Sequence, residues 1–139
     1  MRPPVRRARP DDRPTLSRLQ SHLAEPSPEL LAAADVVGTV LVSVDADDRP
    51  TGYLLAVEDR EACHVAELVV APDRRREGRA RDLLTAAVEA RPAGSVVTVT
   101  VAAGNDAARS LYESVGFEEA GRSPDYFESG DAVAYELTV

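Results

Sequence analysis

The stretch PDRRREGRA, residues 72–80, says more about the fold than any other part of the sequence. It lies between a predicted strand over residues 63–71, which Pro72 ends, and a predicted helix. Gly78 lets the backbone turn tightly with its amides uncovered, and a helix N-terminus supplies N–H groups with a partial positive charge. Five arginines between positions 74 and 81 add to that charge. The stretch therefore predicts a phosphate-binding loop, although it lacks the GK[ST] ending of a P-loop, and a solvated turn is the alternative.

The residues before this loop have the patterns of short helices and of paired strands. Acidic residues followed by proline mark helix starts, and β-branched runs separated by polar turns indicate hairpins. The expected elements are a strand over 5–9, helices from residue 11 and over 29–34, and strands over 36–44, 51–57 and 63–71. The three last strands would form an antiparallel meander.

The residues after the loop predict two helices and three strands. Apolar residues recur at helical spacing from Ala80 to Val88, and Pro92 ends that helix. The run at 95–101 (SVVTVTV) is typical of a central strand. Asn105 is expected to cap the next helix and Gly116 to end it in a left-handed conformation. The last strands are expected over 117–121 and 132–139, joined by a polar stretch over 122–131.

Taken together, these elements predict one α+β domain over residues 1–139. About seven strands form a mixed, mostly antiparallel sheet, and about four helices flank it. A chain of 139 residues with 44% hydrophobic residues has the length and composition for one packed core.

Composition and charge exclude several classes of protein. The net charge of −8 argues against a nucleic-acid-binding protein, and the single cysteine excludes an internal disulfide. The two histidines and one cysteine argue against a metal site. No apolar run reaches the roughly 20 residues of a membrane span, and the first ten residues lack the apolar region of a secretion signal. We therefore expect a cytoplasmic protein without membrane contact. All 16 basic residues are arginine, a composition typical of acidic proteomes.

A second motif accompanies the loop. Arg75-x-x-Gly78-x-Ala80 is followed about 25 residues later by Asn105-Asp106-x-Ala108-x-x-Leu111-Tyr112-Glu113-Ser114-x-Gly116-Phe117. With these motifs the sequence resembles the GNAT superfamily of acyl-CoA N-acyltransferases. The segment LYESVGFEEAGRSPDYFESGDAVAYEL, residues 111–137, is most similar to the ribosomal-protein N-terminal (alanine) acetyltransferases.

This resemblance implies that acetyl-CoA is held between two splayed strands, over 63–71 and 95–101. Its pantetheine arm would bond to the first strand, and its pyrophosphate to the amides of residues 76–81. A backbone N–H near Leu68 or Val69 would stabilise the oxyanion of the reaction. The implied cofactor-binding residues are Leu68, Val69, Val70, Arg75, Arg76, Glu77, Gly78, Arg79, Ala80, Arg81 and Asn105.

The resemblance also implies a general acid. Tyr112 would protonate the leaving thiolate, with a buried core aromatic as the alternative, and Asn105 is alternatively only a helix cap. The family's glutamate base corresponds to Thr100, which cannot act as a base. Glu67 is the best replacement; it is otherwise a strand residue facing solvent. His64 is a poorer candidate, and a water chain is the remaining alternative.

The acceptor site has the least specific pattern. Tyr126 and Phe127 lie in a polar stretch that resembles a peptide-binding loop, and otherwise they pack on the sheet edge. The implied function is transfer of an acetyl group to an amine, expected to be a protein N-terminal α-amine, by direct attack through a tetrahedral intermediate. The alternatives are acetylation of a small-molecule amine, a non-catalytic acyl-CoA-binding module, and an interaction domain that binds other anions. The protein is expected to be a monomer or homodimer.

Overall fold

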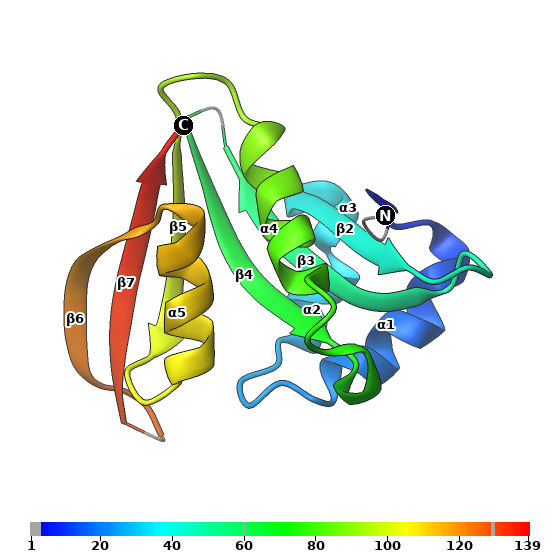
Figure 1. Ribbon diagram of the computed structural model, residues 1–139, viewed down its shortest axis with the longest axis horizontal. Helices are drawn as coiled ribbons and strands as arrows, with labels where there is room; N and C mark the ends of the chain where they lie inside the picture. The colour runs from blue at the N-terminus through cyan, green and yellow to red at the C-terminus, as the bar shows by residue number, and fades with distance from the viewer. Residues whose placement is uncertain (1–3, 60, 129) are drawn as a thin grey trace.

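The computed structural model describes residues 4–59, 61–128 and 130–139. One seven-stranded sheet runs through the molecule in the order β1-β2-β3-β4-β5-β7-β6 (Figure 1). The strands are β1 (Val5–Arg7), β2 (Gly38–Val44), β3 (Pro50–Glu58), β4 (Ala62–Val70), β5 (Val96–Ala102), β6 (Glu118–Phe127) and β7 (Gly130–Thr138). The helices are α1 (Arg13–Gln20), α2 (Pro28–Ala32), α3 (Ala34–Val37), α4 (Arg79–Glu89) and α5 (Asp106–Val115), with 3-10 turns η1 (Pro10–Asp12) and η2 (Pro72–Arg74).

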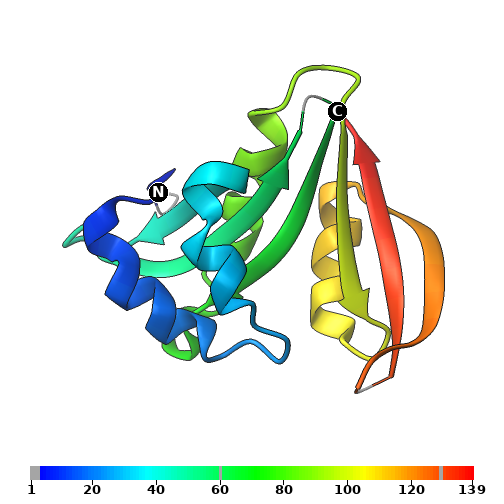
Figure 2. The ribbon, with the colours of Figure 1, turned by 180° about the vertical axis from the view of Figure 1, so that it is seen from behind.

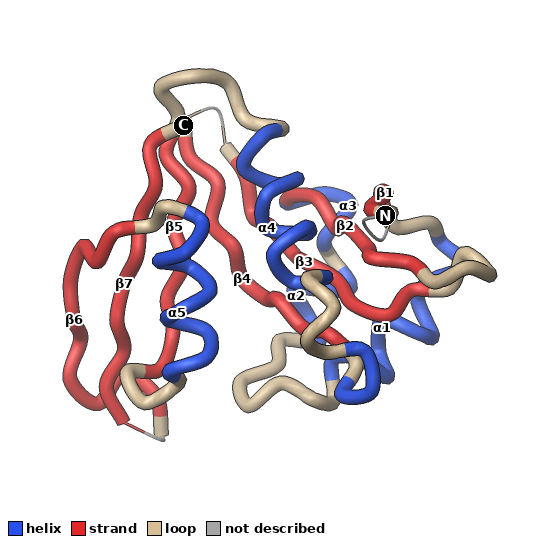
Figure 3. The backbone as a smooth tube through the Cα atoms, in the orientation of Figure 1, coloured by secondary structure: helices blue, strands red, loops and turns tan. Residues whose placement is uncertain are grey.

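The sheet opens between β4 and β5, the two strands that pair in parallel. Their pairing runs only from Ala62 opposite Val96 to Val65 opposite Val99, and both strands continue beyond it. Figures 1 and 3 show the two strands meeting near the C-terminus and diverging towards their other ends. Beyond Val65, β4 therefore has an edge with no strand partner, which leaves backbone hydrogen-bonding groups available to a ligand.

Two apolar cores lie on opposite faces of the sheet. On one face α4 and α5 contribute Leu83, Leu84 and Tyr112 to a cluster that includes Val97 and Val99. On the other face, seen in Figure 2, α1 and α2 cover β3 and β4 and contribute Leu16, Leu19 and Leu31. This division follows from strand alternation, since successive side chains of a central strand face opposite layers.

Most of the predicted elements are confirmed. The meander β2-β3-β4 is antiparallel, the long helix spans Arg79–Glu89, and α5 begins after an Asn105 cap. Gly116 has a φ of 115°, the left-handed conformation expected at the end of that helix. The mixed, mostly antiparallel seven-stranded sheet is the one expected from the sequence.

Two expectations about local structure were wrong. The polar stretch over 122–131 is not a connection, because β6 continues to Phe127 and β7 begins at Gly130. Almost every residue of β6 is exposed, so this edge strand has no apolar alternation to indicate it. The strand expected from residue 36 starts at Gly38, since Val36 and Val37 end α3. Two short helices, α2 and α3, therefore replace the one expected over 29–34, giving five α-helices in the described residues.

In the part of the chain that the structure describes, no helix is long and apolar enough to cross a membrane. The same residues contain no group of three or more histidine, cysteine or acidic side chains placed to hold a metal ion.

Candidate active site

Two adjoining cavities lie at the opening between β4 and β5. The larger cavity, of about 590 Å³, extends along the loop before α4, the end of β4 and the start of α5. The smaller cavity, of about 280 Å³, extends towards the C-terminal hairpin of β6 and β7. Both are lined by Leu23, Ala24, Leu68, Asn105, Ala108 and Tyr112. A ligand in one cavity can therefore reach a ligand in the other.

The backbone of the loop before α4 forms an anion-binding curve along the larger cavity. Arg76 and Gly78 have φ values of 67° and 81°, both in the left-handed region. Two left-handed residues so close together turn the chain sharply before the helix, while Arg75 in front of them is extended. Gly78 is also the N-cap of α4, whose first amides carry a partial positive charge. These features fit a pyrophosphate, such as that of acetyl-CoA.

The arginine side chains of this loop differ in what they can contact. Arg79 is only 8% exposed, and its guanidinium bonds to Glu77 Oε1 at 2.7 Å, Ser43 Oγ at 3.1 Å and the Val44 carbonyl at 3.0 Å. That guanidinium anchors α4 to the end of β2, which leaves the backbone amide of Arg79 for a ligand. Arg75 and Arg76 are exposed. Of the eleven predicted cofactor-binding residues, all but Glu77 line the larger cavity.

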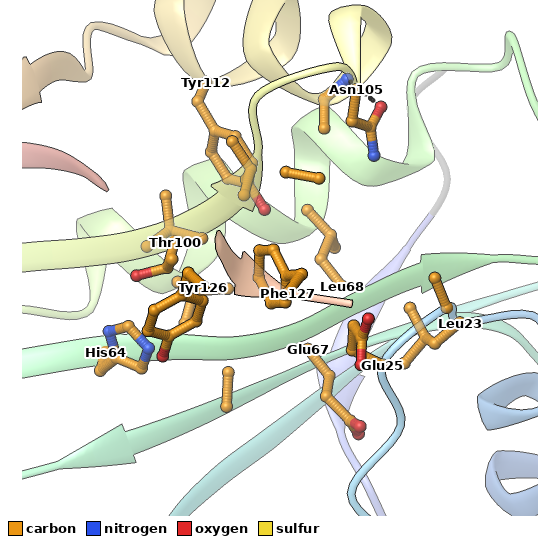
Figure 4. A pocket seen from close by; sticks show the side chains of 17 residues that line it. Leu23, Glu25, His64, Glu67, Leu68, Thr100, Asn105, Tyr112, Tyr126 and Phe127 are labelled. Carbon is orange, nitrogen blue, oxygen red and sulfur yellow. Dashed lines mark hydrogen bonds between the residues drawn. The ribbon is translucent and has the colours of Figure 1, made fainter. Parts of the chain in front are cut away.

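Tyr112 stands between the two cavities. Its ring is 4% exposed and packs edge-on against Phe117 and stacked against Tyr135, with centroid distances of 5.6 and 6.2 Å. Figure 4 shows its hydroxyl directed into the smaller cavity. Burial raises the pKa of this hydroxyl above its ordinary value, so it keeps its proton at neutral pH. Tyr112 is thus a core aromatic whose protonated hydroxyl faces the cavity.

Asn105 both caps a helix and lines the cavities. Its side-chain oxygen accepts a hydrogen bond from the Ala108 N–H at 3.1 Å, which makes it the cap of α5. It lines both cavities as well. The two interpretations of Asn105 are therefore compatible.

The smaller cavity has an aromatic wall. Tyr126 and Phe127, at the end of β6, meet edge to face with their centroids 4.8 Å apart, and Tyr126 is 61% exposed. Figure 4 shows them on the side of the cavity opposite Glu25 and Leu23. They lie in a strand and not in the polar loop that the sequence indicated, but they do line this cavity. This wall can contact the apolar part of an acceptor.

Two polar side chains, His64 and Thr100, complete the same cavity. His64 Nδ1 lies 2.8 Å from Thr98 Oγ1, and burial lowers the pKa of the ring, so the imidazole is neutral at pH 7. Thr100 lines the cavity and carries no titratable group.

Glu67 lines the smaller cavity but is not a free carboxylate. It is 5% exposed, so the alternative interpretation of Glu67 as a strand residue facing solvent was wrong. Gln20, Ser27 and Tyr53 all donate hydrogen bonds to it. In Figure 4 its carboxylate points away from Tyr112.

One wall of the two cavities was not predicted from the sequence. Residues 21–27, between α1 and α2, place Leu23 and Ala24 against both cavities and Glu25 against the smaller one. The segment lies between the helix expected from residue 11 and the helix expected over 29–34. Its position beside β4 depends on tertiary contacts that no local pattern encodes.

Comparison with known proteins agrees with this geometry. The sequence matches the acetyltransferase (GNAT) domain family over residues 28–139. A curated relative, mycothiol acetyltransferase from Clavibacter sepedonicus, is 41% identical over 91 residues, 66% of this chain and 29% of that protein. The chain thus spans less than a third of that relative's length.

Solved structures share the fold over nearly the whole chain. The ribosomal-protein-S18-alanine N-acetyltransferase from Escherichia coli superposes with a TM-score of 0.85 at 22% identity, covering 98% of this chain and 93% of that one. NAA60 from Arabidopsis thaliana, in complex with acetyl-CoA, gives 0.86 at 16% identity, covering 98% and 99%. The expected fold is therefore confirmed. Because the family match also spans most of the sequence, this chain belongs to the GNAT acetyltransferase family.

Proposed function

We propose that this protein transfers an acetyl group from acetyl-CoA, held in the larger cavity, to an amine that enters through the smaller one. The observation that carries the proposal is the position of Tyr112, which lines both cavities. A side chain placed there can contact the donor and the acceptor of a group transfer at the same time. The acyl-CoA-binding module without catalysis is less well supported, since the hydroxyl that catalysis needs is present.

Acetyl-CoA would be bound chiefly by backbone groups. The amides of residues 76–81 would hold its pyrophosphate, with Arg75 and Arg76 adding charge at the rim. The edge of β4 at Leu68, Val69 and Val70 would bond to the pantetheine arm, and Arg75 Nε, which donates to the Val70 carbonyl at 3.3 Å, lies at the end of this edge. When bound, this cosubstrate supplies an activated thioester, and an N–H of the same edge would stabilise the oxyanion.

Tyr112 would act as the general acid. Its high pKa keeps the hydroxyl protonated until the carbon–sulfur bond breaks. The leaving thiolate forms in the same poorly solvated space, where burial makes thiolates more basic as well. The hydroxyl can therefore pass its proton to the sulfur as negative charge develops there.

The acceptor amine must lose a proton, either before or during attack. An α-amine, with a pKa of about 8, has a useful neutral fraction at pH 7, unlike a lysine side chain, whose pKa is about 10.4. Two routes remain for the proton: Glu67 as base, or water in the open part of the smaller cavity.

The acceptor we propose is a protein N-terminal α-amine. The aromatic pair Tyr126 and Phe127 is suited to the side chains that follow such an amine. A small-molecule amine is the second candidate, favoured by the 41% identity to a mycothiol acetyltransferase.

The experiment is thiol release from acetyl-CoA in the presence of pooled N-terminal peptides or of small amines, at low and at molar salt. Release with peptides only supports the N-terminal acceptor, and release with small amines only moves the function to metabolite acetylation. No release with either pool, while calorimetry detects acetyl-CoA binding, would establish the non-catalytic module.

A further inference from the structure

A β-bulge directs Glu67 to the face of the sheet that α1 covers. The pairing of β3 with β4 shifts here: Leu55 lies opposite Glu67, but Ala56 lies opposite Val65. Strict alternation would place Glu67 on the same face as Val65, under α4 and α5. The extra residue, Ala66, reverses this, as bulges do when they redirect a side chain. Glu67 consequently reaches the ends of α1 and α2.

Both oxygens of the Glu67 carboxylate accept hydrogen bonds from neighbouring groups. Its Oε1 accepts from Gln20 Nε2 at 3.1 Å and from the Tyr53 hydroxyl at 2.9 Å. Its Oε2 accepts from Gln20 Nε2 at 3.2 Å and from the Ser27 N–H at 2.8 Å. A carboxylate has about four acceptor positions. An amine could therefore give it a proton only if one of these contacts broke.

All three neighbours of the Glu67 carboxylate donate hydrogen bonds to it. Tyr53 is fully buried, and burial together with the nearby charge of Glu67 raises the pKa of its hydroxyl, which stays protonated. The Ser27 N–H and the Gln20 NH₂ group can only donate. The Ser27 N–H and the Gln20 NH₂ group would lose their acceptor if their contacts to Glu67 broke, and an unmet donor at a buried site is costly.

These bonds join both ends of the segment over residues 21–27. Gln20 is the last residue of α1, and Ser27 directly precedes α2. Between them only Leu23 is half-buried, while Ser21, His22, Ala24, Glu25 and Pro26 are exposed. Packing alone holds this segment weakly, although it forms the wall common to the two cavities.

We propose that Glu67 is a positioning residue: its carboxylate fixes the 21–27 segment against β4 so that Leu23, Ala24 and Glu25 form the wall of the acceptor cavity. The inference rests on the proposed acetyl transfer for its kinetic consequences. It assigns the proton of the amine to water, with the amine attacking in its neutral form, and not to Glu67.

Tyr53→Phe tests this proposal, because it removes one donor to Glu67 and keeps the buried ring. Thr51→Val is the matched control, since it removes another buried hydroxyl of β3, the one that donates to the Ser43 carbonyl at 3.0 Å. We expect about tenfold faster amide hydrogen exchange over residues 21–27 in Tyr53→Phe, as a lost bond to a charged group implies, and no change there in Thr51→Val. We also expect a higher KM for the acceptor, a kcat within about threefold of the wild type and an unmoved pH–rate profile, since Tyr53 acts only through the wall.

If Glu67 were the general base, the same experiment would give a different result. A carboxylate that loses a donor is protonated more easily, so if Glu67 were the base, the acidic limb of the pH–rate profile would move to higher pH in Tyr53→Phe. That shift, with unchanged exchange over 21–27, would overturn the proposal. Glu67→Gln should repeat the Tyr53→Phe pattern with a larger rise in KM, and Tyr53→Phe alone decides if Glu67→Gln does not fold. If the wild-type protein shows no turnover, the proposed acetyl transfer is refuted. The amide hydrogen exchange over residues 21–27 would still decide the role of Glu67.

Discussion

The two cavities are built in different ways, although they share a wall. The larger cavity is lined mainly by the stretch from the end of β4 through the loop into α4, with α5 and three residues of the 21–27 segment completing it. The smaller cavity gathers residues from the 21–27 segment, β4, β5, α5 and the end of β6. The first therefore depends on local backbone conformation, and the second on how distant segments pack.

This difference explains which cavity tolerates sequence change. A loop that binds through N–H groups needs a glycine and a helix start, while its side chains can vary. A cavity that binds through side chains changes its ligand whenever one of them changes. The larger cavity should thus keep its ligand across relatives, and the smaller one should define the acceptor.

Tyr112→Phe should have the largest effect, because this residue serves both cavities. The ring and its packing remain, and only the proton donor is lost. We expect kcat to fall about 10²- to 10⁴-fold, the usual contribution of a general acid. The affinity for acetyl-CoA, measured by calorimetry, should change little. Equal turnover in the two proteins would remove Tyr112 from the mechanism.

Gly78→Val should impair the larger cavity alone. A Cβ at Gly78 would meet no atom within 4 Å, so the substitution adds no clash. The φ of 81° is strained for a β-branched residue, by about 1–3 kcal/mol, and the loop should rearrange. We expect about 10- to 100-fold weaker binding of acetyl-CoA, in line with that strain.

Gly104→Val is the control for this prediction. Gly104 also has open space around it, and its backbone is not in the left-handed region. It should bind acetyl-CoA as the wild type does. Unchanged affinity in Gly78→Val would refute the assignment of the loop to the pyrophosphate.

Features that depend on adjacent residues could be predicted from the sequence, whereas features that depend on the packing of distant segments could not. The order of strand, loop and helix around residues 72–80, the cap at Asn105 and the turn at Gly116 were all predicted correctly, because each depends on a few adjacent residues. The bulge at Ala66 was not predictable, since its pattern is an ordinary apolar run. Its consequence is that Glu67 faces Gln20 and Ser27, about 40 positions away in the sequence. Long-range contacts of this kind appear only in the folded chain.

Tyr126→Ala should affect the smaller cavity alone. Its ring packs on Phe127 and is largely exposed, so its loss should leave the fold intact. We expect the KM for the preferred acceptor to rise about fivefold, the loss of one aromatic contact, with unchanged affinity for acetyl-CoA. Steady-state kinetics with the acceptor varied would measure this. A change in acetyl-CoA affinity instead would mean that the hairpin also contacts the donor.

Arg76→Gln should have the smallest effect and should separate charge from backbone within the larger cavity. Arg76 is exposed, so its attraction to a phosphate is screened, and we expect about two- to threefold weaker binding of acetyl-CoA at low salt. At 1 M salt the screening length falls to about 3 Å, and the difference from the wild type should vanish. The defect of Gly78→Val should persist there, because the rearranged loop displaces amides that would bond the pyrophosphate directly. Arg18→Gln, on α1 and lining neither cavity, is the control for a changed net charge. If Arg76→Gln weakened binding more than Gly78→Val, the site would depend on arginine side chains, and the contrast between a backbone-built donor site and a side-chain-built acceptor site would fail.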